Sequence, residues 1–185
     1  SKSEGFIWED GDLRRDESIR YDFTYLGITP TEVSWGADEL DPHIKKYEDE
    51  RTDQFNGNLA NEWYSGKNFI VLRYADVLLC YAECLNELGE TGEANTVVNQ
   101  VRARAWGGTL PNEMAWNYGQ DEFRVQIMDE RIRELCFEGW RRMDLIRTGK
   151  FVELIKERNP WAKKSGTIKE FHMRWPIPDT EIKNN

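Results

Sequence analysis

The segment from Arg73 to Leu88 places apolar side chains at helical spacing in two neighbouring stripes. The first stripe consists of Val71, Ala75, Leu78, Ala82 and Leu85, and the second of Val77, Tyr81, Cys84 and Leu88. Asp76, Glu83 and Glu87 are left for the remaining face. Because a helix that is apolar along two stripes packs against neighbours on both sides, the sequence predicts a helix enclosed by other helices.

The rest of the chain after residue 67 continues this helical pattern. Helices are expected at Glu93–Arg104, Asp121–Phe137, Trp140–Arg147 and Phe151–Arg158, separated by glycine and proline. Trp175–Pro178 is expected to be extended, because its two prolines fix a non-helical path. We therefore interpret residues 67–185 as one helical region.

Residues 1–66 have a different character. They contain 7 basic and 16 acidic residues, whereas residues 67–185 contain 18 of each. They also lack sustained periodicity and are rich in turn-forming residues. We expect an acidic, loop-rich region packed on the helices, with one or two short strands such as Ser18–Tyr25.

The composition excludes several classes of protein. A net charge of −9 without a basic stripe argues against nucleic-acid binding, and the acidic first third would repel anionic lipid. No apolar run reaches the length of about 20 residues that a membrane-spanning helix needs. A neutral ligand fits this charge better.

No motif for a cofactor or a metal ion is recognisable. The chain has no glycine-rich phosphate loop, no G-x-S-x-G and no H-E-x-x-H. Three cysteines cannot form a complete disulfide framework, and the two histidines, His43 and His172, stand alone. We therefore expect no cofactor, no metal site and packing roles for the cysteines.

Three glutamates, Glu130, Glu134 and Glu138, are spaced four residues apart. A glycoside hydrolase needs two carboxylates facing each other across the sugar, and glutamates stacked on one helix do not provide this. Because arginines are interleaved with them, ion pairing is the favoured interpretation.

Tryptophan is unusually frequent, with eight residues. Trp140 and Trp175 are expected to lie in the core, whereas Trp8, Trp35 and Trp63 fall in the acidic loop region. An exposed aromatic ring beside acids and amides suits a sugar, whose apolar face packs on the ring. We take these three as candidate glycan-stacking residues, with anchoring of the loops onto the helices as the alternative.

Four segments together resemble the SusD/RagB family in order and spacing. They are residues 73–89 (RYADVLLCYAECLNELG), 98–105 (VNQVRARA), 130–147 (ERIRELCFEGWRRMDLIR) and 176–182 (PIPDTEI). The third is similar to the family's E-R-x-x-E-L-x-F-E-G-x-R-x-x-D-L-x-R. In the acidic region, Asp12-Leu13-Arg14 and Lys46-Tyr47 correspond to a D-x-R and a K-x-Y-like step. The chain departs from the pattern at Asp76 (usually Glu), Cys84 (usually Ala) and Trp106 (often Gly).

This resemblance implies an all-α fold of tetratricopeptide-like helix pairs, arranged as a superhelical array with long irregular loops and few short strands. It implies a non-enzymatic, surface-exposed lipoprotein of the outer membrane, anchored by a lipid outside this chain. The implied function is to capture a neutral oligosaccharide or polysaccharide for a SusC/RagA-like TonB-dependent transporter. The chain would then be the C-terminal portion of a longer protein. A glycoside hydrolase using loop carboxylates and a helical-repeat interaction scaffold remain alternatives.

The family pattern also prescribes charged residues that show no catalytic spacing. They are Arg73, Glu83, Arg102, Arg131, Glu134, Arg142 and Asp144. We expect several of them to form ion pairs between helices, at least partly buried, that fix how the helices stack.

Overall fold

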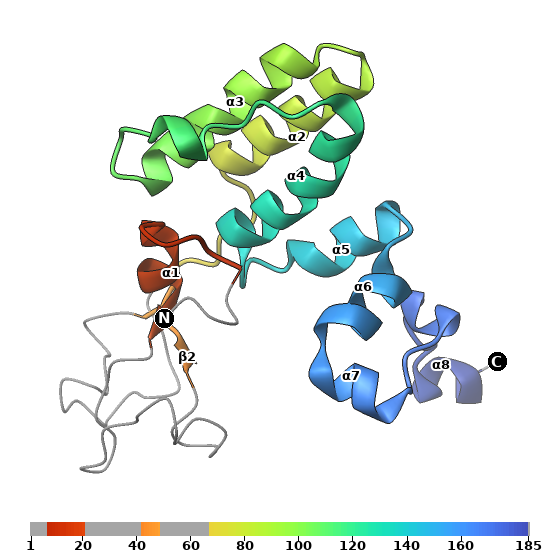
Figure 1. Ribbon diagram of the computed structural model, residues 1–185. Coiled ribbons are helices and arrows are strands. Elements are labelled where there is room, and N and C mark those ends of the chain that lie inside the picture. The colour runs from red at the N-terminus through yellow and green to blue at the C-terminus, as the bar shows by residue number, and fades with distance from the viewer. Residues whose placement is uncertain (1–6, 21–41, 49–66, 185) are drawn as a thin grey trace, which may run out of the picture. The chain divides into compact units, whose positions relative to one another are not determined.

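The computed structural model describes residues 7–20, 42–48 and 67–184, and these are mostly helical (Figure 1). The chain divides into two compact units, Ser1–Glu138 and Gly139–Asn185, which are described separately. Within the described residues, no helix is both long enough and apolar enough to cross a bilayer. The division that the sequence suggests, into an acidic region 1–66 and a helical region 67–185, rests on composition and stays a prediction.

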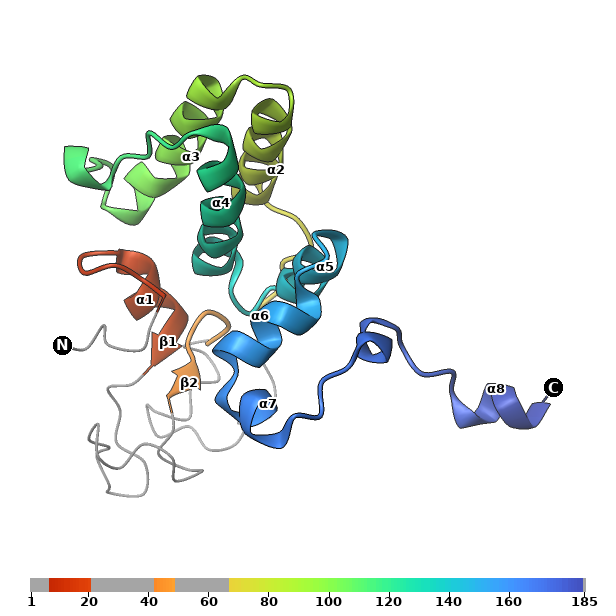
Figure 2. The same cartoon turned by 45° about the vertical axis from the view of Figure 1, so that its right-hand side comes forward.

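The first unit contains most of the helical array. Its elements are α1 (Leu13–Ser18), β1 (Ile19–Arg20), β2 (His43–Ile44), α2 (Tyr74–Glu87), α3 (Thr91–Ala105), the short 3-10 helix η3 (Asn112–Met114) and α4 (Gln120–Leu135). Helices α2 and α3 form an antiparallel hairpin, and α4 packs against both (Figures 1 and 2). The core between them consists of Leu79, Ala82, Ala94, Val98, Phe123 and Ile127.

Paired asparagines position the connection between α3 and α4. The Nδ2 of Asn99 donates to the backbone carbonyl of Trp116 at 3.1 Å, and its Oδ1 accepts from the backbone N–H of Trp116 at 2.7 Å. One helical turn earlier, Asn95 makes the same two bonds with Tyr118, at 2.9 and 3.2 Å. Trp116 is thereby held edge-on to Phe123 at 5.5 Å between ring centroids. The connection is therefore fixed on α3 rather than free in solvent.

The all-α prediction is confirmed, and all five expected helices are present with ends that differ by at most two residues. The extended path of Trp175–Pro178 is also confirmed. One element of the acidic region differs from the expectation of loops and strands, because α1 forms at Leu13–Ser18. Asp12 caps it by accepting the backbone N–H of Arg14 at 2.9 Å.

The expected strand at Ser18–Tyr25 is present only in part. β1 pairs with β2 antiparallel, with Ile19 opposite Ile44 and Arg20 opposite His43. Residues 21–25 lie outside the described residues. The two strands are only two residues long, and the small sheet that they form joins α1 to the segment 42–48.

The burial of α2 corrects the sequence analysis. The second predicted stripe is exposed, with Val77, Tyr81, Cys84 and Leu88 at the surface. Asp76, assigned to the outer face, is instead buried. On α2, the carboxylate of Asp76 therefore lies inside, where it can form an ion pair with a neighbouring helix. The apolar residues of the second stripe face solvent.

The second unit contains α5 (Trp140–Arg147), α6 (Phe151–Arg158), α7 (Pro160–Ser165), the 3-10 helix η4 (Glu170–Met173) and α8 (Asp179–Asn184). Arg142 joins its parts, because its guanidinium lies 4.9 Å from the Phe151 ring centroid and 4.6 Å from that of Trp175. It also donates to the carbonyl of His172 at 2.7 Å.

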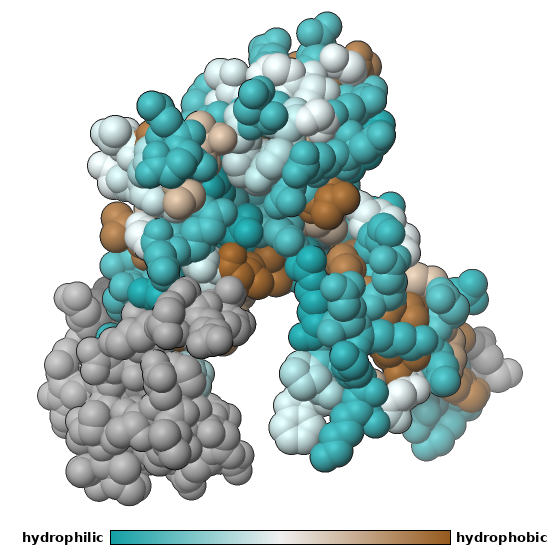
Figure 3. All heavy atoms as spheres, viewed as in Figure 1, coloured by the Kyte–Doolittle hydropathy of each residue, from teal (hydrophilic) through white to brown (hydrophobic). Residues whose placement is uncertain are grey.

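Hydrophobic side chains are exposed on this second unit (Figure 3). They include Phe171, Ile177 and Ile182. Trp175 is 79% exposed, so the expectation that it lies in the core is wrong. The guanidinium of Arg142 stacks on its ring.

Candidate functional site

The three glutamates at the end of α4 are all buried. Glu130 and Glu134 lie one turn apart on α4, and Glu138 follows the helix. Burying a carboxylate is costly unless positive groups and hydrogen-bond donors surround it. In the first unit, four segments outside α4 supply positive groups: α1, the residues after β2, Arg73 before α2, and α3. The resulting assembly is called the ion cluster below.

Arg14 of α1 reaches the centre of the ion cluster. Its guanidinium binds Asp12 through two bonds, Nε to Oδ1 at 2.9 Å and Nη2 to Oδ2 at 2.6 Å. Nη1 donates to Glu130 at 2.7 Å and to Glu134 at 3.1 Å. Because Asp12 also caps α1, the same carboxylate orders the helix and orients the arginine that docks it.

Arg73 connects the two later glutamates. Nη1 lies 2.5 Å from Glu134 Oε1, and Nε lies 2.8 Å from Glu138 Oε2. Arg104 of α3 also pairs with Glu134. Lys46, which follows β2, donates to Glu138 at 2.6 Å and to the carbonyls of Glu134 and Cys136, each at 3.1 Å.

Arg102 of α3 is almost completely buried. It donates from Nη1 to Glu130 at 2.9 Å, from Nη2 to Glu9 at 2.7 Å and from Nε to the carbonyl of Met114 at 3.0 Å. Its guanidinium also lies over the rings of Trp106 and Trp116, at 4.9 and 5.7 Å from their centroids. This one side chain therefore ties α3 to α4, to Glu9 and to the loop after α3.

A second buried ion pair links α4 to α2. Arg131 Nη1 lies 2.9 Å from Asp76 Oδ1, and both side chains are buried. The thiol of Cys80 lies beside this pair, 3.4 Å from Arg131 Nη1 and 3.7 Å from Asp76 Oδ1. Burial raises the pKa of the Cys80 thiol, so it stays protonated beside this pair.

The electrostatics of the ion cluster oppose acid–base catalysis by Glu134. Burial by itself raises the pKa of Glu134, but Arg73, Arg14 and Arg104 outweigh burial and hold the pKa below its ordinary value. A general acid in a glycosidase needs a raised pKa. Glu134 therefore stays ionised and acts as a fixed anion that gathers three arginines.

The lowered pKa of Glu134 predicts a loss of stability in acid. A carboxyl whose pKa is lower in the folded than in the unfolded state stabilises the fold above its unfolded pKa, about 4.3. That contribution is lost as the pH falls through the lower, folded pKa. We expect the free energy of unfolding to fall below about pH 4.3, and to fall less steeply in Glu134→Gln. Identical slopes in denaturant titrations of both proteins would contradict this assignment.

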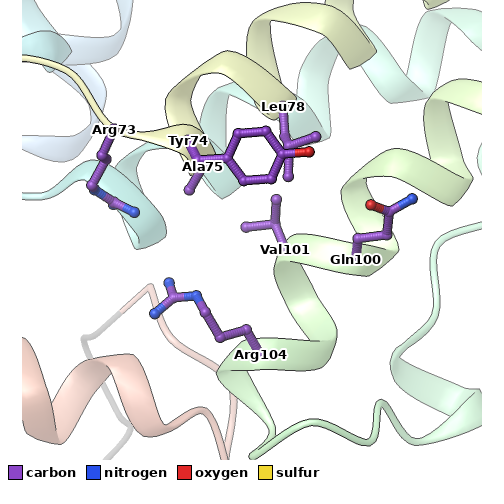
Figure 4. A pocket seen from close by; sticks show the side chains of 7 residues that line it. All are labelled: Arg73, Tyr74, Ala75, Leu78, Gln100, Val101 and Arg104. Carbon is purple, nitrogen blue, oxygen red and sulfur yellow. The ribbon is translucent and has the colours of Figure 1, made fainter.

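A pocket of about 420 Å³ opens between α2 and α3, beside the ion cluster. Ala75, Leu78 and Val101 form its apolar part. Figure 4 shows the guanidinium groups of Arg73 and Arg104 on one side, the ring of Tyr74 at the centre and Gln100 on the other side. The lining residues include no carboxylate, thiol or histidine. The pocket can therefore accept an apolar or amphipathic group but offers no nucleophile with a base.

The comparisons with known proteins agree with this architecture. The model of the SusD family matches residues 7–185. The chain belongs to the SusD family. A SusD-like protein P25 of Formosa agariphila is 39% identical over 120 residues, which is 64% of this chain and 22% of that protein. The starch-binding protein SusD of Bacteroides thetaiotaomicron is 27% identical over 147 residues, covering 77% of this chain and 24% of that protein.

A solved structure supports the same assignment. The crystal structure of a SusD homolog from Bacteroides thetaiotaomicron superposes with a TM-score of 0.70 and 26% identity, over 94% of this chain and 39% of that one. The chain thus spans about a quarter or less of the curated SusD relatives and about two fifths of the solved homolog.

The charged residues of the SusD pattern lie in both units. Arg73, Arg102 and Glu134 are members of the ion cluster, and Arg131 forms the buried pair with Asp76. Glu83 is half-buried on α2. In the second unit, Arg142 stacks on aromatic rings, and Asp144 accepts from Arg147 at 3.0 Å.

The tryptophan hypothesis needs a correction for one of its three residues. Trp8 is only 6% exposed, and its Nε1 donates to the carbonyl of Arg133 at 3.1 Å. Of the two interpretations given for Trp8, the structure therefore supports the anchoring of its segment onto the helices and not an exposed stacking ring. Trp35 and Trp63 lie outside the described residues.

The ion pairing predicted for Glu130, Glu134 and Glu138 is confirmed. The sequence analysis did not predict ion pairs for five other members of the ion cluster, which are Glu9, Asp12, Arg14, Lys46 and Arg104. Two short sequence motifs of the SusD family in the acidic region did point to two of these residues, because D-x-R contains Arg14 and K-x-Y contains Lys46. Their spacing gave no indication that both side chains would meet the end of α4, far away in the sequence.

Proposed function

We propose that this chain is part of a binding protein that captures a glycan, a neutral oligosaccharide or polysaccharide, at the surface of the outer membrane. The observation that carries the proposal is membership of the SusD family over residues 7–185. Similarity to a starch-binding protein over 77% of the chain supports the choice of ligand class. The low count of basic residues in the acidic region, residues 1–66, is compatible with an uncharged ligand.

The proposal includes a place in nutrient uptake. The protein would be a surface-exposed lipoprotein, with its lipid anchor outside this chain, and would deliver the glycan to a SusC/RagA-like TonB-dependent transporter. The SusD-like names of its relatives support this proposal.

A binding function is favoured over glycoside hydrolysis. The buried carboxylates of α4 are held in ion pairs, and the pKa of Glu134 is lowered rather than raised. A retaining or inverting hydrolase needs one carboxyl that is protonated near neutral pH. A hydrolase would release reducing sugar from a bound glycan, and a protein-binding scaffold would bind no glycan at all.

Ligand binding is tested by affinity electrophoresis of the full-length protein against a panel of neutral polysaccharides. We expect retardation by at least one of them without release of reducing sugar. Trp35→Ala and Trp63→Ala are expected to weaken binding by about tenfold each, since truncation of an aromatic anchor removes its stacking area.

Trp161→Ala is the matched control, because Trp161 is an exposed tryptophan of the second unit. Binding that survives both loop substitutions would remove Trp35 and Trp63 from the site while leaving glycan capture intact. Absence of binding to every glycan of the panel would contradict the proposed function.

A further inference from the structure

The pocket between α2 and α3 combines an apolar part with a few polar groups. Leu78 and Val101 belong to the apolar part, and Tyr74, Gln100 and Arg104 contribute a ring, an amide and a guanidinium (Figure 4). Its volume of about 420 Å³ lies within the range of pockets that hold small organic molecules. Such pockets are lined mainly by apolar side chains, while a small number of polar groups fix the orientation of the ligand. The lining therefore has the composition of a small-molecule site.

Arg104 has hydrogen-bond donors that the protein does not use. Its side chain is 62% exposed, and Nη2 pairs with Glu134. Within the described part of the chain this is its one ion pair, so most of the five N–H donors of the guanidinium are open to solvent. Arg73 lies on the same side of the pocket but is committed to Glu134 and Glu138 (Figure 4). Arg104 is therefore the group that can receive an anionic ligand.

The charge balance of the ion cluster also favours an anion at this place. Among the described residues, its ion pairs join six cations to five carboxylates. The cations are Arg14, Lys46, Arg73, Arg102, Arg104 and Arg133, and the carboxylates are Glu9, Asp12, Glu130, Glu134 and Glu138. Of these cations, Arg104 has the most exposed side chain. The positive charge in excess can therefore attract an anion to the pocket.

Tyr74 and Gln100 are available to a ligand as well. Tyr74 is 74% exposed, and Gln100 is exposed. The tyrosine ring lies beside Leu78 and Val101, so it extends the apolar part of the pocket (Figure 4). The described residues that line the pocket include no carboxylate that would repel an anion.

The guanidinium and the apolar residues together define the class of ligand. A guanidinium presents parallel N–H donors that match the two oxygens of a carboxylate. The side chains of Leu78 and Val101 offer no hydrogen-bond partner, so a sugar placed against them would bury hydroxyl groups at a cost. A hydrocarbon body packs against the same side chains without this cost, because its burial is favourable.

We propose that this pocket binds a small organic acid whose carboxylate pairs with Arg104 and whose hydrocarbon body packs against Leu78, Val101 and the ring of Tyr74. The side-chain amide of Gln100 can donate a further hydrogen bond to the ligand. The site is additional to the proposed capture of a glycan, and this proposal does not depend on that one.

The first test titrates the full-length protein with phenylacetate in a calorimeter. We expect saturable binding to one site, and binding at least about tenfold weaker for phenylacetamide, which lacks the charge, and for inorganic phosphate, which lacks the hydrocarbon body. Absence of saturable binding, or equal affinity for the acid and its amide, would overturn the proposal. Tighter binding of methyl glucuronide than of phenylacetate would assign the pocket to an acidic sugar and would also overturn it.

The second test compares Arg104→Gln with Arg124→Gln in the full-length protein. Arg124 is also an exposed arginine that pairs with a glutamate, but it lies on α4, outside the pocket. We expect Arg104→Gln to weaken the binding of phenylacetate by about tenfold or more, and Arg124→Gln to leave it unchanged. Equal affinities in both variants would contradict the proposal.

Tyr74→Ala supplies an independent variant, because an exposed side chain can be removed without loss of the fold. We expect it to weaken the binding of phenylacetate by about threefold or more, since the ligand loses the contact with the ring. If Arg104→Gln does not fold, this variant decides, and an unchanged affinity would overturn the proposal.

Discussion

Replacing Glu134 with glutamine is expected to lower the free energy of unfolding by roughly 3–5 kcal/mol. The substitution keeps the shape of the side chain but removes the negative charge that Arg14, Arg73 and Arg104 share. Arg14 is buried, so its charge would lose part of its compensation where water cannot replace it. Loss of one partner from a buried ion pair is more destabilising than loss of a surface pair.

The measurement is denaturant unfolding, with Glu87→Gln as the matched control. Glu87 also pairs with an arginine, with 2.7 Å between Arg124 Nε and Glu87 Oε1, but both side chains are exposed. The control is expected to change the unfolding free energy far less, because solvent screens this pair. Similar losses in the two variants would show that Glu134 behaves as a surface charge.

Replacing Arg102 with lysine is expected to cost roughly 3 kcal/mol or more, although the charge is retained. The planar guanidinium serves Glu130, Glu9 and the carbonyl of Met114 from three different nitrogens. A lysine ammonium is a single compact charge and cannot reach all three acceptors. It would also lose the stacking over the two tryptophan rings.

Arg104→Lys is the control for this substitution. It lies on the same helix and pairs with Glu134, but its side chain is 62% exposed. Lysine at this position can keep the charge near Glu134 while its ammonium stays hydrated, so a much smaller loss is expected. Equal destabilisation by the two arginine-to-lysine substitutions in denaturant titrations would contradict the assigned role of Arg102.

Because so many charges are buried, the stability of the helical array depends on residues of the acidic region. Arg14 and Lys46 come from the acidic region, yet they neutralise glutamates at the end of α4. Without them, Glu130 and Glu138 would keep fewer counter-charges in a buried position. The ion cluster therefore couples the order of α1 and of residues 42–48 to the helical array.

The sequence by itself located five of the helices and identified the family, whereas α1, α7 and α8 were not expected. Periodicity and punctuation located all five expected helices, because a helix depends on residues within a few positions of each other. Four motifs in the right order identified the SusD family for the same reason, since each motif is local.

The tertiary structure decided which side chains lie inside. Asp76 and the three glutamates Glu130, Glu134 and Glu138 are buried although they are charged, because arginines from other elements reach them. Trp8 is buried although its segment reads as a loop, because its indole finds the carbonyl of Arg133 on α4. Such contacts join residues about 50 to 125 positions apart. The spacing of residues along the chain holds no information about these distances, so only the folded arrangement of the helices could reveal them.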